Sequence, residues 1–293
     1  MDFNQLIDPY TQRLLMLIGI NIIMALGLNL VTGVTGQLSM GHAGFMSIGA
    51  YTSAILSMQF DLSFPLALLA GAVMAALFGF LLGLPTLRLE GDYLAMVTIG
   101  FAEIVRVFFL NFVPGGKAVG MAGIPQKTTL GLVMVLLILV IVLNYTLLKS
   151  RMGRAFYAIR EDEIAAHACG VDITRFKIIA FTVGSFLGGL GGALYAHYIF
   201  YINPQDFDFM KSIELLNMVV LGGLGSIPGT IIGSVIITLA PELLRVVAQY
   251  RLLFYGGLLV LLMIFRPNGL LGNVRWYDVK KRFKKNEVKS WPS

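Results

Sequence analysis

Residues able to perform catalytic or metal chemistry are few in this sequence and lie far apart. Three separate segments each hold one histidine: His42, His167 and His197. They form no His-x-x-x-His pair and have no neighbouring set of carboxylate ligands. Ser185 and Ser226 lie outside a Gly-x-Ser-x-Gly elbow, and the chain has no P-loop for ATP. The single cysteine, Cys169, excludes an intramolecular disulfide. We therefore expect neither catalytic residues nor a metal or cofactor in this chain.

Two glycine-rich stretches carry polar groups suited to a path through a membrane. They cover residues 36–44 and 222–229, one in each half of the chain. Interrupted helices in corresponding halves point to a translocation site, because their freed backbone groups can line a cavity. The candidate path residues are Gly36, Gln37, Ser39, Gly41, His42, Glu103, Asn217, Gly222, Gly223 and Gly225. Two ordinary packing kinks are the competing interpretation.

Glu103 and Arg106 lie near the middle of an apolar run, 93–113. They are three residues apart and so share one face of a helix. Charged groups at membrane depth usually pair and face the protein interior. We expect an ion pair here, which either fixes the rotation of the helix or lies along a substrate path.

A charged, helix-forming stretch at 153–170 interrupts the apolar sequence and suggests contact with a cytoplasmic partner. Glu161, Asp162 and Glu163 suit the positive N-terminal end of a short helix. Gly170 suits the position just past its C-terminus, where a left-handed backbone carries no side-chain penalty. A plain connecting loop is the alternative.

The composition identifies the class of protein that must position these residues. The chain is 57% hydrophobic and only 13% charged, with a mean hydropathy of +0.81. About 20 apolar residues cross the hydrocarbon layer. The sequence predicts an all-α, polytopic helix bundle with about eight to nine membrane segments, some broken or re-entrant. The expected spans are 13–32, 37–58, 63–84, 93–113, 129–148, 178–200, 212–225, 227–248 and 251–266. The sequence lacks a basic face with aromatic stacking platforms, so we expect no nucleic-acid partner. The spans are expected to contact membrane lipid.

Charge predicts the orientation of these spans. Basic residues gather in the loop 149–177 and the tail 267–293, so the positive-inside rule places both in the cytoplasm. Five crossings before the loop then put the N-terminus outside. That end carries no lysine or arginine in its first dozen residues, so we also expect no cleavable signal peptide. We expect one transmembrane domain, 1–293, that contains the cytoplasmic loop and ends in the basic tail.

A glycine stripe at 184–192 predicts close helix packing. Gly184, Gly188 and Gly192 are four residues apart, a spacing that lets helix backbones approach closely in lipid. We expect this packing to be within the chain.

Four blocks of sequence resemble LivM-type permeases of branched-chain amino-acid ABC importers. They are 36–44, 154–177, 219–229 and 265–270, and they extend over nearly the whole chain. The resemblance implies a permease of the bacterial or archaeal cytoplasmic membrane that is not itself an enzyme. Its implied partners are a LivH-like sibling permease, two cytoplasmic ATPases that bind ATP and Mg, and an extracytoplasmic substrate-binding protein.

The run 163–170 is similar to the loop by which importer permeases dock on their ATPases. It departs from that pattern by one inserted residue, Ile164. The resemblance assigns ATPase coupling to Arg160, Glu161, Asp162, Glu163, Ala165, Ala166 and Gly170.

Other functions stay open from the sequence. Permeases of the family that the chain resembles carry branched-chain or other neutral amino acids, and related permeases carry urea or short amides. A stand-alone secondary transporter or channel would need more ion-coupling or pore-lining acids than this chain has at membrane depth. A membrane-embedded enzyme would need a metal or nucleophile cluster.

Overall fold

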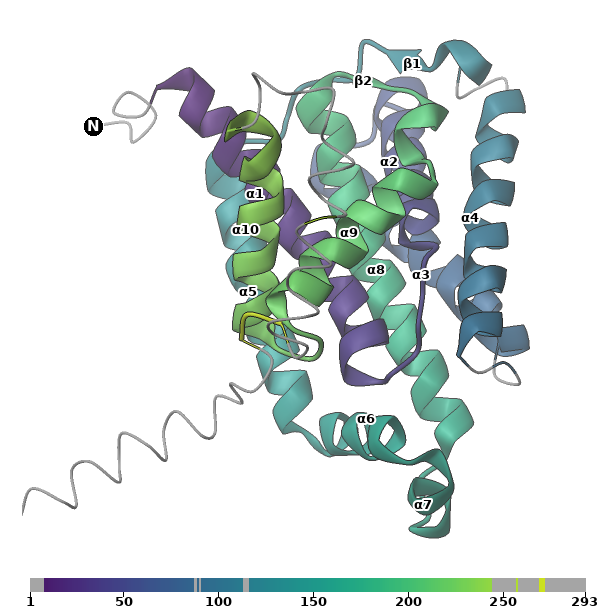
Figure 1. The fold of residues 1–293 in the computed structure, drawn as a ribbon. Helices are drawn as coiled ribbons and strands as arrows, with labels where there is room; N and C mark the ends of the chain where they lie inside the picture. Colours follow the sequence, from purple (N-terminus) through teal and green to yellow (C-terminus); the bar gives the residue numbers. More distant parts are fainter. Residues whose placement is uncertain are drawn as a thin grey trace, which may run out of the picture.

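The computed structural model describes residues 8–86, 89, 91–112, 116–243, 257 and 269–271 (Figure 1). The first half holds α1 (Pro9–Leu28), the π-helix η2 (Asn29–Val34), α2 (His42–Gln59), α3 (Phe64–Thr86), α4 (Asp92–Asn111), η4 (Lys117–Val119), β1 (Met121–Ala122) and α5 (Leu130–Lys149). The second half holds α6 (Arg151–Glu161), α7 (Glu163–Ala168), α8 (Ile173–Ile199), β2 (Tyr201–Ile202), η5 (Pro204–Phe207), α9 (Phe209–Gly222) and α10 (Ile227–Leu243).

The bundle is helical and suited to a membrane, as the sequence predicted. Among the described residues, five helices are long and apolar enough to cross a bilayer: Pro9–Val34, Phe64–Pro85, Asp92–Asn111, Leu130–Lys149 and Ile173–Ile199. Ile227–Ala240 is a shorter apolar helix. The expected span 251–266, apart from residue 257, and most of the tail 267–293 lie outside the described residues.

Helix α8 forms the centre of the bundle, where it packs against α1, α2 and α3. Its glycine stripe makes this possible. A Cβ at Gly184 would lie 2.8 Å from the carbonyl oxygen of Gly27 in α1, and one at Gly192 would lie 2.0 Å from that of Met46 in α2. The predicted close packing is therefore confirmed, and it joins helices of this one chain.

An irregular connection separates the first helical segment, α1 and η2, from α2. After α1 the chain widens into the π-helix η2, and residues 36–41 have no regular secondary structure before α2 begins at His42. Met40 N donates to Thr98 Oγ1 at 3.0 Å, which holds this connection against α4. The predicted segment 37–58 is thus interrupted, but its helix starts five residues later than expected because the glycine-rich stretch precedes the helix.

The second interruption separates two short helices. We expected spans at 212–225 and 227–248, whereas α9 begins earlier and ends at Gly222. Gly223 and Gly225 both have positive φ, and such a backbone cannot continue a helix. The Ser226 hydroxyl accepts from Gly229 N at 3.2 Å, where α10 starts.

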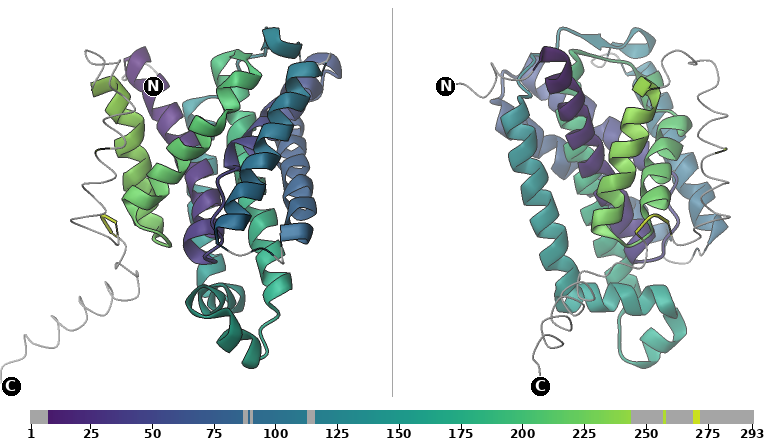
Figure 2. Two further views of the ribbon diagram at one scale, coloured as in Figure 1. Left: turned by 45° about the vertical axis from the view of Figure 1, so that its right-hand side comes forward. Right: turned by 60° about the vertical axis from the view of Figure 1, so that its left-hand side comes forward.

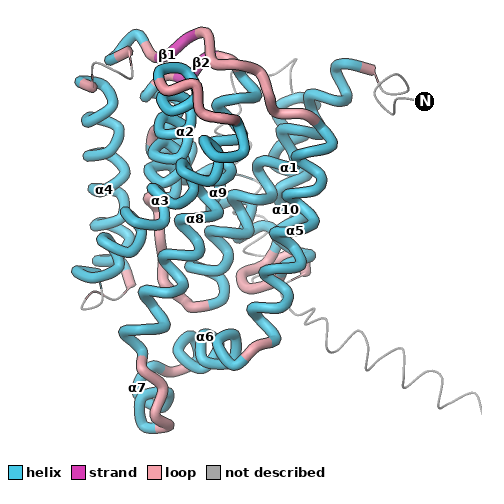
Figure 3. Tube along the Cα trace, turned by 180° about the vertical axis from the view of Figure 1, so that it is seen from behind, coloured by secondary structure: helices cyan, strands magenta, loops and turns pink. Residues whose placement is uncertain are grey.

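The two ends of the bundle differ in structure. Figures 1 and 2 show β1, β2 and the start of α1 at one end and α6 and α7 at the other. Strands β1 and β2 pair antiparallel, with Met121 opposite Ile202. Figure 3 shows α4 and α5 at opposite sides of the bundle. Helix α1 starts at the end away from α6 (Figure 1), and four of the five crossings expected before 149–177 are among the helices long and apolar enough to span a bilayer.

Candidate functional site

Helices α6 and α7 form a bent unit at one end of the bundle. The Ser150 hydroxyl accepts from the amide nitrogens of Met152 and Gly153 and so caps α6. Phe156 and Ile159 are buried on its inner face, where Phe156 meets Phe176 edge to face.

Helix α7 has the ends that the sequence predicted, with one exception. The Asp162 carboxylate accepts from Ala165 N at 2.9 Å at its N-terminus. Gly170 has φ of +81° just past its C-terminus. Glu161, however, ends α6 instead of starting α7, because the chain bends at Asp162, whose backbone is extended. The expectation that all three acids begin one short helix is wrong for Glu161.

An ion pair ties α7 to α8. Lys177 Nζ lies 2.6 Å from Glu163 Oε1, and the lysine side chain is only 8% exposed. Lys177 was expected to be a basic residue of the loop, but it lies within α8. The pair therefore joins α7 directly to a core helix.

Arg160 joins the two interrupted segments. Its guanidinium Nη1 donates to the carbonyl oxygen of Gly33 in η2 and, at 3.4 Å, to that of Leu224 between α9 and α10. The Asn29 side chain completes the contact by accepting from Gly225 N at 2.8 Å. The Cα of Arg160 also lies 3.5 Å from where a Gly36 Cβ would be. We call Asn29, Gly33, Arg160, Leu224 and Gly225 the arginine junction.

A cavity of about 330 Å³ lies beside α7 and reaches the first break. Its lining contains Gly36, Gln37, Leu89, Gly91, Leu94, Asp162, Glu163, Ile164 and Lys177. The structure thus brings two predicted path residues, Gly36 and Gln37, next to two predicted coupling residues. These are Asp162 and Glu163, which lie beside Lys177.

The other coupling residues lie on α7 itself. Ala166 is buried, whereas Ala165 is exposed. Ile164, which the sequence comparison treated only as an insertion, is 84% exposed on this helix (Figure 1 shows α7 at the lower end). The sequence signal for this residue was an isoleucine placed directly after three acids.

The polar residues of the first break are buried. Gln37, Ser39 and His42 are 5%, 1% and 1% exposed. Gln37 Nε2, Ser39 Oγ and His42 Nε2 have no hydrogen-bond partner among the described residues. Gly41 faces α4, since a Cβ there would lie 2.0 Å from the Thr98 carbonyl oxygen.

The remaining path candidates are spread through the chain. Asn217 is buried in α9, and Gly222 packs against Gly229 of α10. Gly223 packs beside Gly269. The structure therefore places Gly225 in the arginine junction and Gly36 beside Arg160, but it keeps Asn217 and Gly222 within the α9–α10 pair.

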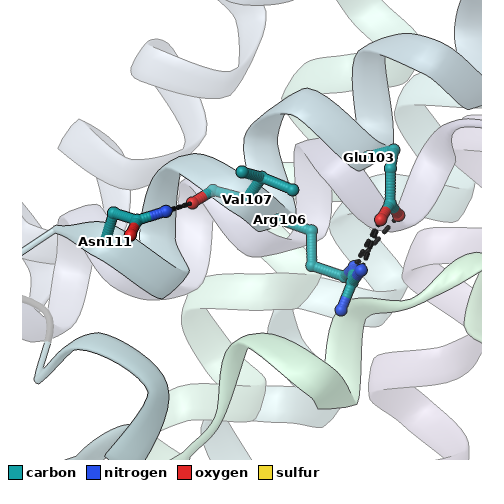
Figure 4. A network of polar contacts seen from close by, with 4 residues as sticks. All are labelled: Glu103, Arg106, Val107 and Asn111. Carbon is teal, nitrogen blue, oxygen red and sulfur yellow. Dashed lines mark hydrogen bonds and ion pairs between the residues drawn. The ribbon is translucent and has the colours of Figure 1, made fainter.

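Glu103 is separated from this group. It forms the predicted ion pair with Arg106 on α4, with Arg106 Nε 3.0 Å from Glu103 Oε2 (Figure 4). The Glu103 side chain is 49% exposed. Within this chain the glutamate lies on the outward face of α4 and does not face the interior of the bundle.

Some residues of this region could not be found from sequence motifs. Thr98 and Ser212 hold the first break by accepting from Met40 N and Ala43 N. Asn29 reaches across 196 residues of sequence. Buried polar residues within apolar runs were the available signal. In the part of the chain that the structure describes, no three His, Cys, Asp or Glu residues could hold a metal ion together.

Comparison with known proteins identifies the family. The profile of the branched-chain amino acid transport system permease component matches residues 10–265. The permease LivM of Escherichia coli is 39% identical over 79% of this chain and 63% of that protein. The LivM of Salmonella typhimurium is 40% identical over the same shares, so the chain matches less than two thirds of each relative. The Escherichia coli permease LivH is 34% identical over 42% of this chain and 40% of that protein. No solved structure matches the chain significantly. The chain is a multi-pass membrane protein and belongs to the family of branched-chain amino acid transport permeases.

Proposed function

We propose that this chain is the permease subunit of an ATP-driven ABC importer that moves branched-chain amino acids into the cytoplasm. The observation that carries the proposal is the α6–α7 unit. It projects from one end of the bundle and is tied to both interrupted segments through Arg160. Such a unit suits a permease driven by a partner, since the force must enter at one end and reach the path.

In this mechanism α7 is the coupling helix. Two cytoplasmic ATPases bind ATP and Mg, close together, and push on the exposed Ile164 and the acids around it. Lys177 carries the movement to α8 through Glu163, while Arg160 carries it to Gly33 and Leu224. Shifts of these segments open the path alternately outward and inward.

The full assembly contains a LivH-like sibling permease as the other half of a heterodimer. A substrate-binding protein delivers the amino acid on the outer side. The chain lies in the cytoplasmic membrane of a bacterium or archaeon, with α6, α7 and the C-terminus in the cytoplasm and the N-terminus outside. The names of the LivM and LivH relatives support the substrate class and the pairing.

A urea or short-amide importer of the same family is the second candidate. The binding protein normally sets selectivity, so the test must use the whole complex. The affinity-tagged chain is purified with its neighbours, and ATP-dependent uptake of leucine, urea and ribose is measured in vesicles that contain the binding protein. We expect two ATPases and a sibling permease to copurify and leucine alone to accumulate. Purification of the chain without ATPases would contradict the importer function. Uptake of urea instead of leucine would make urea the substrate.

A further inference from the structure

Helix α4 differs from the other exposed spanning helices in what it presents to its surroundings. The exposed face of α3 is apolar, with Leu66, Val73 and Leu77 all about half exposed at 56%, 52% and 49%. The middle of α5 likewise exposes aliphatic side chains, such as Ile138 at 61% and Leu139 at 54%. Hydrocarbon tails can cover both faces without desolvating a charge.

The exposed face of α4 carries the Glu103–Arg106 ion pair instead. Met96, Ile104 and Val107 are 57%, 70% and 45% exposed on this helix, with Glu103 among them near its middle. Figure 4 shows the glutamate and arginine on the same stretch of α4. Charged groups at membrane depth almost always face protein or water instead of lipid. Something other than lipid must therefore cover this face.

The same face is continuous with the first glycine-rich break. A notch beside Glu103 is lined by Met40 from the 36–41 connection, by Ile99 and Ala102 of α4, and by Phe207 and Phe209. Phe209 and Met210 extend the exposed surface onto the start of α9, at 40% and 52% exposure. Aromatic, methionine and arginine side chains, all present on this surface, are enriched in protein interfaces.

We infer that the outward face of α4, together with the start of α9, is the surface on which the sibling permease docks. This inference rests on the proposed function, which supplies a second permease subunit. The sibling would cover the ion pair and close the notch, so that the border between the subunits runs past Met40. Helices α3 and α5 would face lipid.

Photo-crosslinking within the complete importer tests the assignment. Benzoylphenylalanine replaces Ile104 or Val107 on α4, and in matched controls it replaces Leu139 on α5 or Leu77 on α3. We expect covalent products with the sibling from both α4 positions and at least tenfold less from the controls, which attach to lipid. Attachment of the α4 probes to lipid alone, or to a second copy of this chain, would overturn the inference. Equal sibling products from the controls would also overturn it.

Two further readouts keep this result separate from the proposed function. ATPases in the same purified complex test the importer, whatever the α4 probes contact. Glu103→Arg should lower the amount of copurified sibling about tenfold at unchanged levels of this chain, and adding Arg106→Glu should restore it. Unchanged sibling recovery with Glu103→Arg would count against the docking surface, while loss of the ATPases would count against the importer.

Discussion

Arg160 connects segments that lie far apart in the sequence. Its guanidinium donates to carbonyl oxygens of Gly33 and Leu224, which stand at the ends of two interrupted crossings. Such carbonyls lack helical partners and need a donor. A guanidinium offers five N–H groups in a fixed fork, so one side chain can hold two backbone segments. At the residue scale, this arginine is the point where α6 contacts both halves of the chain.

Replacing this arginine tests its role in coupling. Arg160→Gln removes the charged donor, and Arg160→Lys keeps the charge but not the fork. Couplings between sites are typically worth about 1–3 kcal/mol, so we expect Arg160→Gln to lower leucine uptake roughly tenfold while ATP hydrolysis continues. Uptake and ATPase activity are measured in the same vesicles. Arg154→Gln, at an exposed position of the same helix, is the control and should retain uptake. Normal uptake by Arg160→Gln would refute the coupling role.

The ion pair between α7 and α8 allows a charge-exchange test. Lys177 is almost buried, so Glu163→Lys would set two positive charges side by side and displace α7. We expect Glu163→Lys and Lys177→Glu each to uncouple ATP hydrolysis from uptake. The double exchange should recover a substantial part of the transport. If the double variant is no better than the single ones, the pair does not transmit movement.

At the element scale, α2 and α8 pack closely through glycine. A Cβ on Gly49 of α2 would lie 2.1 Å from the carbonyl oxygen of Gly189 in α8. Gly41 is placed in the same way against α4. Small residues let backbones approach, and close approach supplies the packing that water cannot drive in lipid. Gly41, a candidate path residue, therefore also allows close packing.

Two glycine substitutions, one at a tightly packed position and one at an open position, test this helix packing. Gly49→Leu would force α2 and α8 apart, and overpacking of this kind costs about 1–3 kcal/mol or more. We expect a markedly lower midpoint of thermal unfolding in detergent. Gly131→Leu on α5, where no atom lies within 4 Å of the added Cβ, should leave the midpoint unchanged. Equal midpoints for the two variants would show that the α2–α8 contact is not tight.

Local features of the sequence predicted the local structure well. The capping of α7 by Asp162 and the left-handed Gly170 follow from rules that act over a few residues. The apolar runs likewise predicted the long spanning helices. The start of α2 and the contacts of Arg160 could not be predicted, because they depend on residues as much as 169 positions away. The outward exposure of Glu103 depends on how α4 rotates against α2, which helical periodicity alone does not determine.

At the scale of the whole molecule, the account depends on which end of the bundle faces the cytoplasm. Figure 1 places η4 and β1 at the end opposite α6 and α7. The basic residues around α6 favour a cytoplasmic position for that end. Val119 in η4 is 79% exposed and would then face outward.

Labelling from outside tests this orientation. Lys149→Cys and Val119→Cys are each introduced into a chain with Cys169→Ser, so that one thiol is present. An impermeant maleimide should modify the cysteine at position 119 in right-side-out vesicles. The cysteine at position 149 should react only after lysis. The opposite pattern would invert the topology and remove α7 from contact with the cytoplasm.

The proposed function requires that α7 contact an ATPase and receive force from it, and photo-crosslinking from α7 detects that contact. Benzoylphenylalanine replaces Ile164, which is 84% exposed on α7, and in the control it replaces Val119 at the opposite end. Both complexes are irradiated with and without ATP, and the attached protein is identified by mass. We predict that the probe at 164 attaches to the ATPase subunit, in a yield that changes with ATP, and that the probe at 119 does not. Absence of any ATPase product from position 164 in a complex that retains its ATPases would contradict the account.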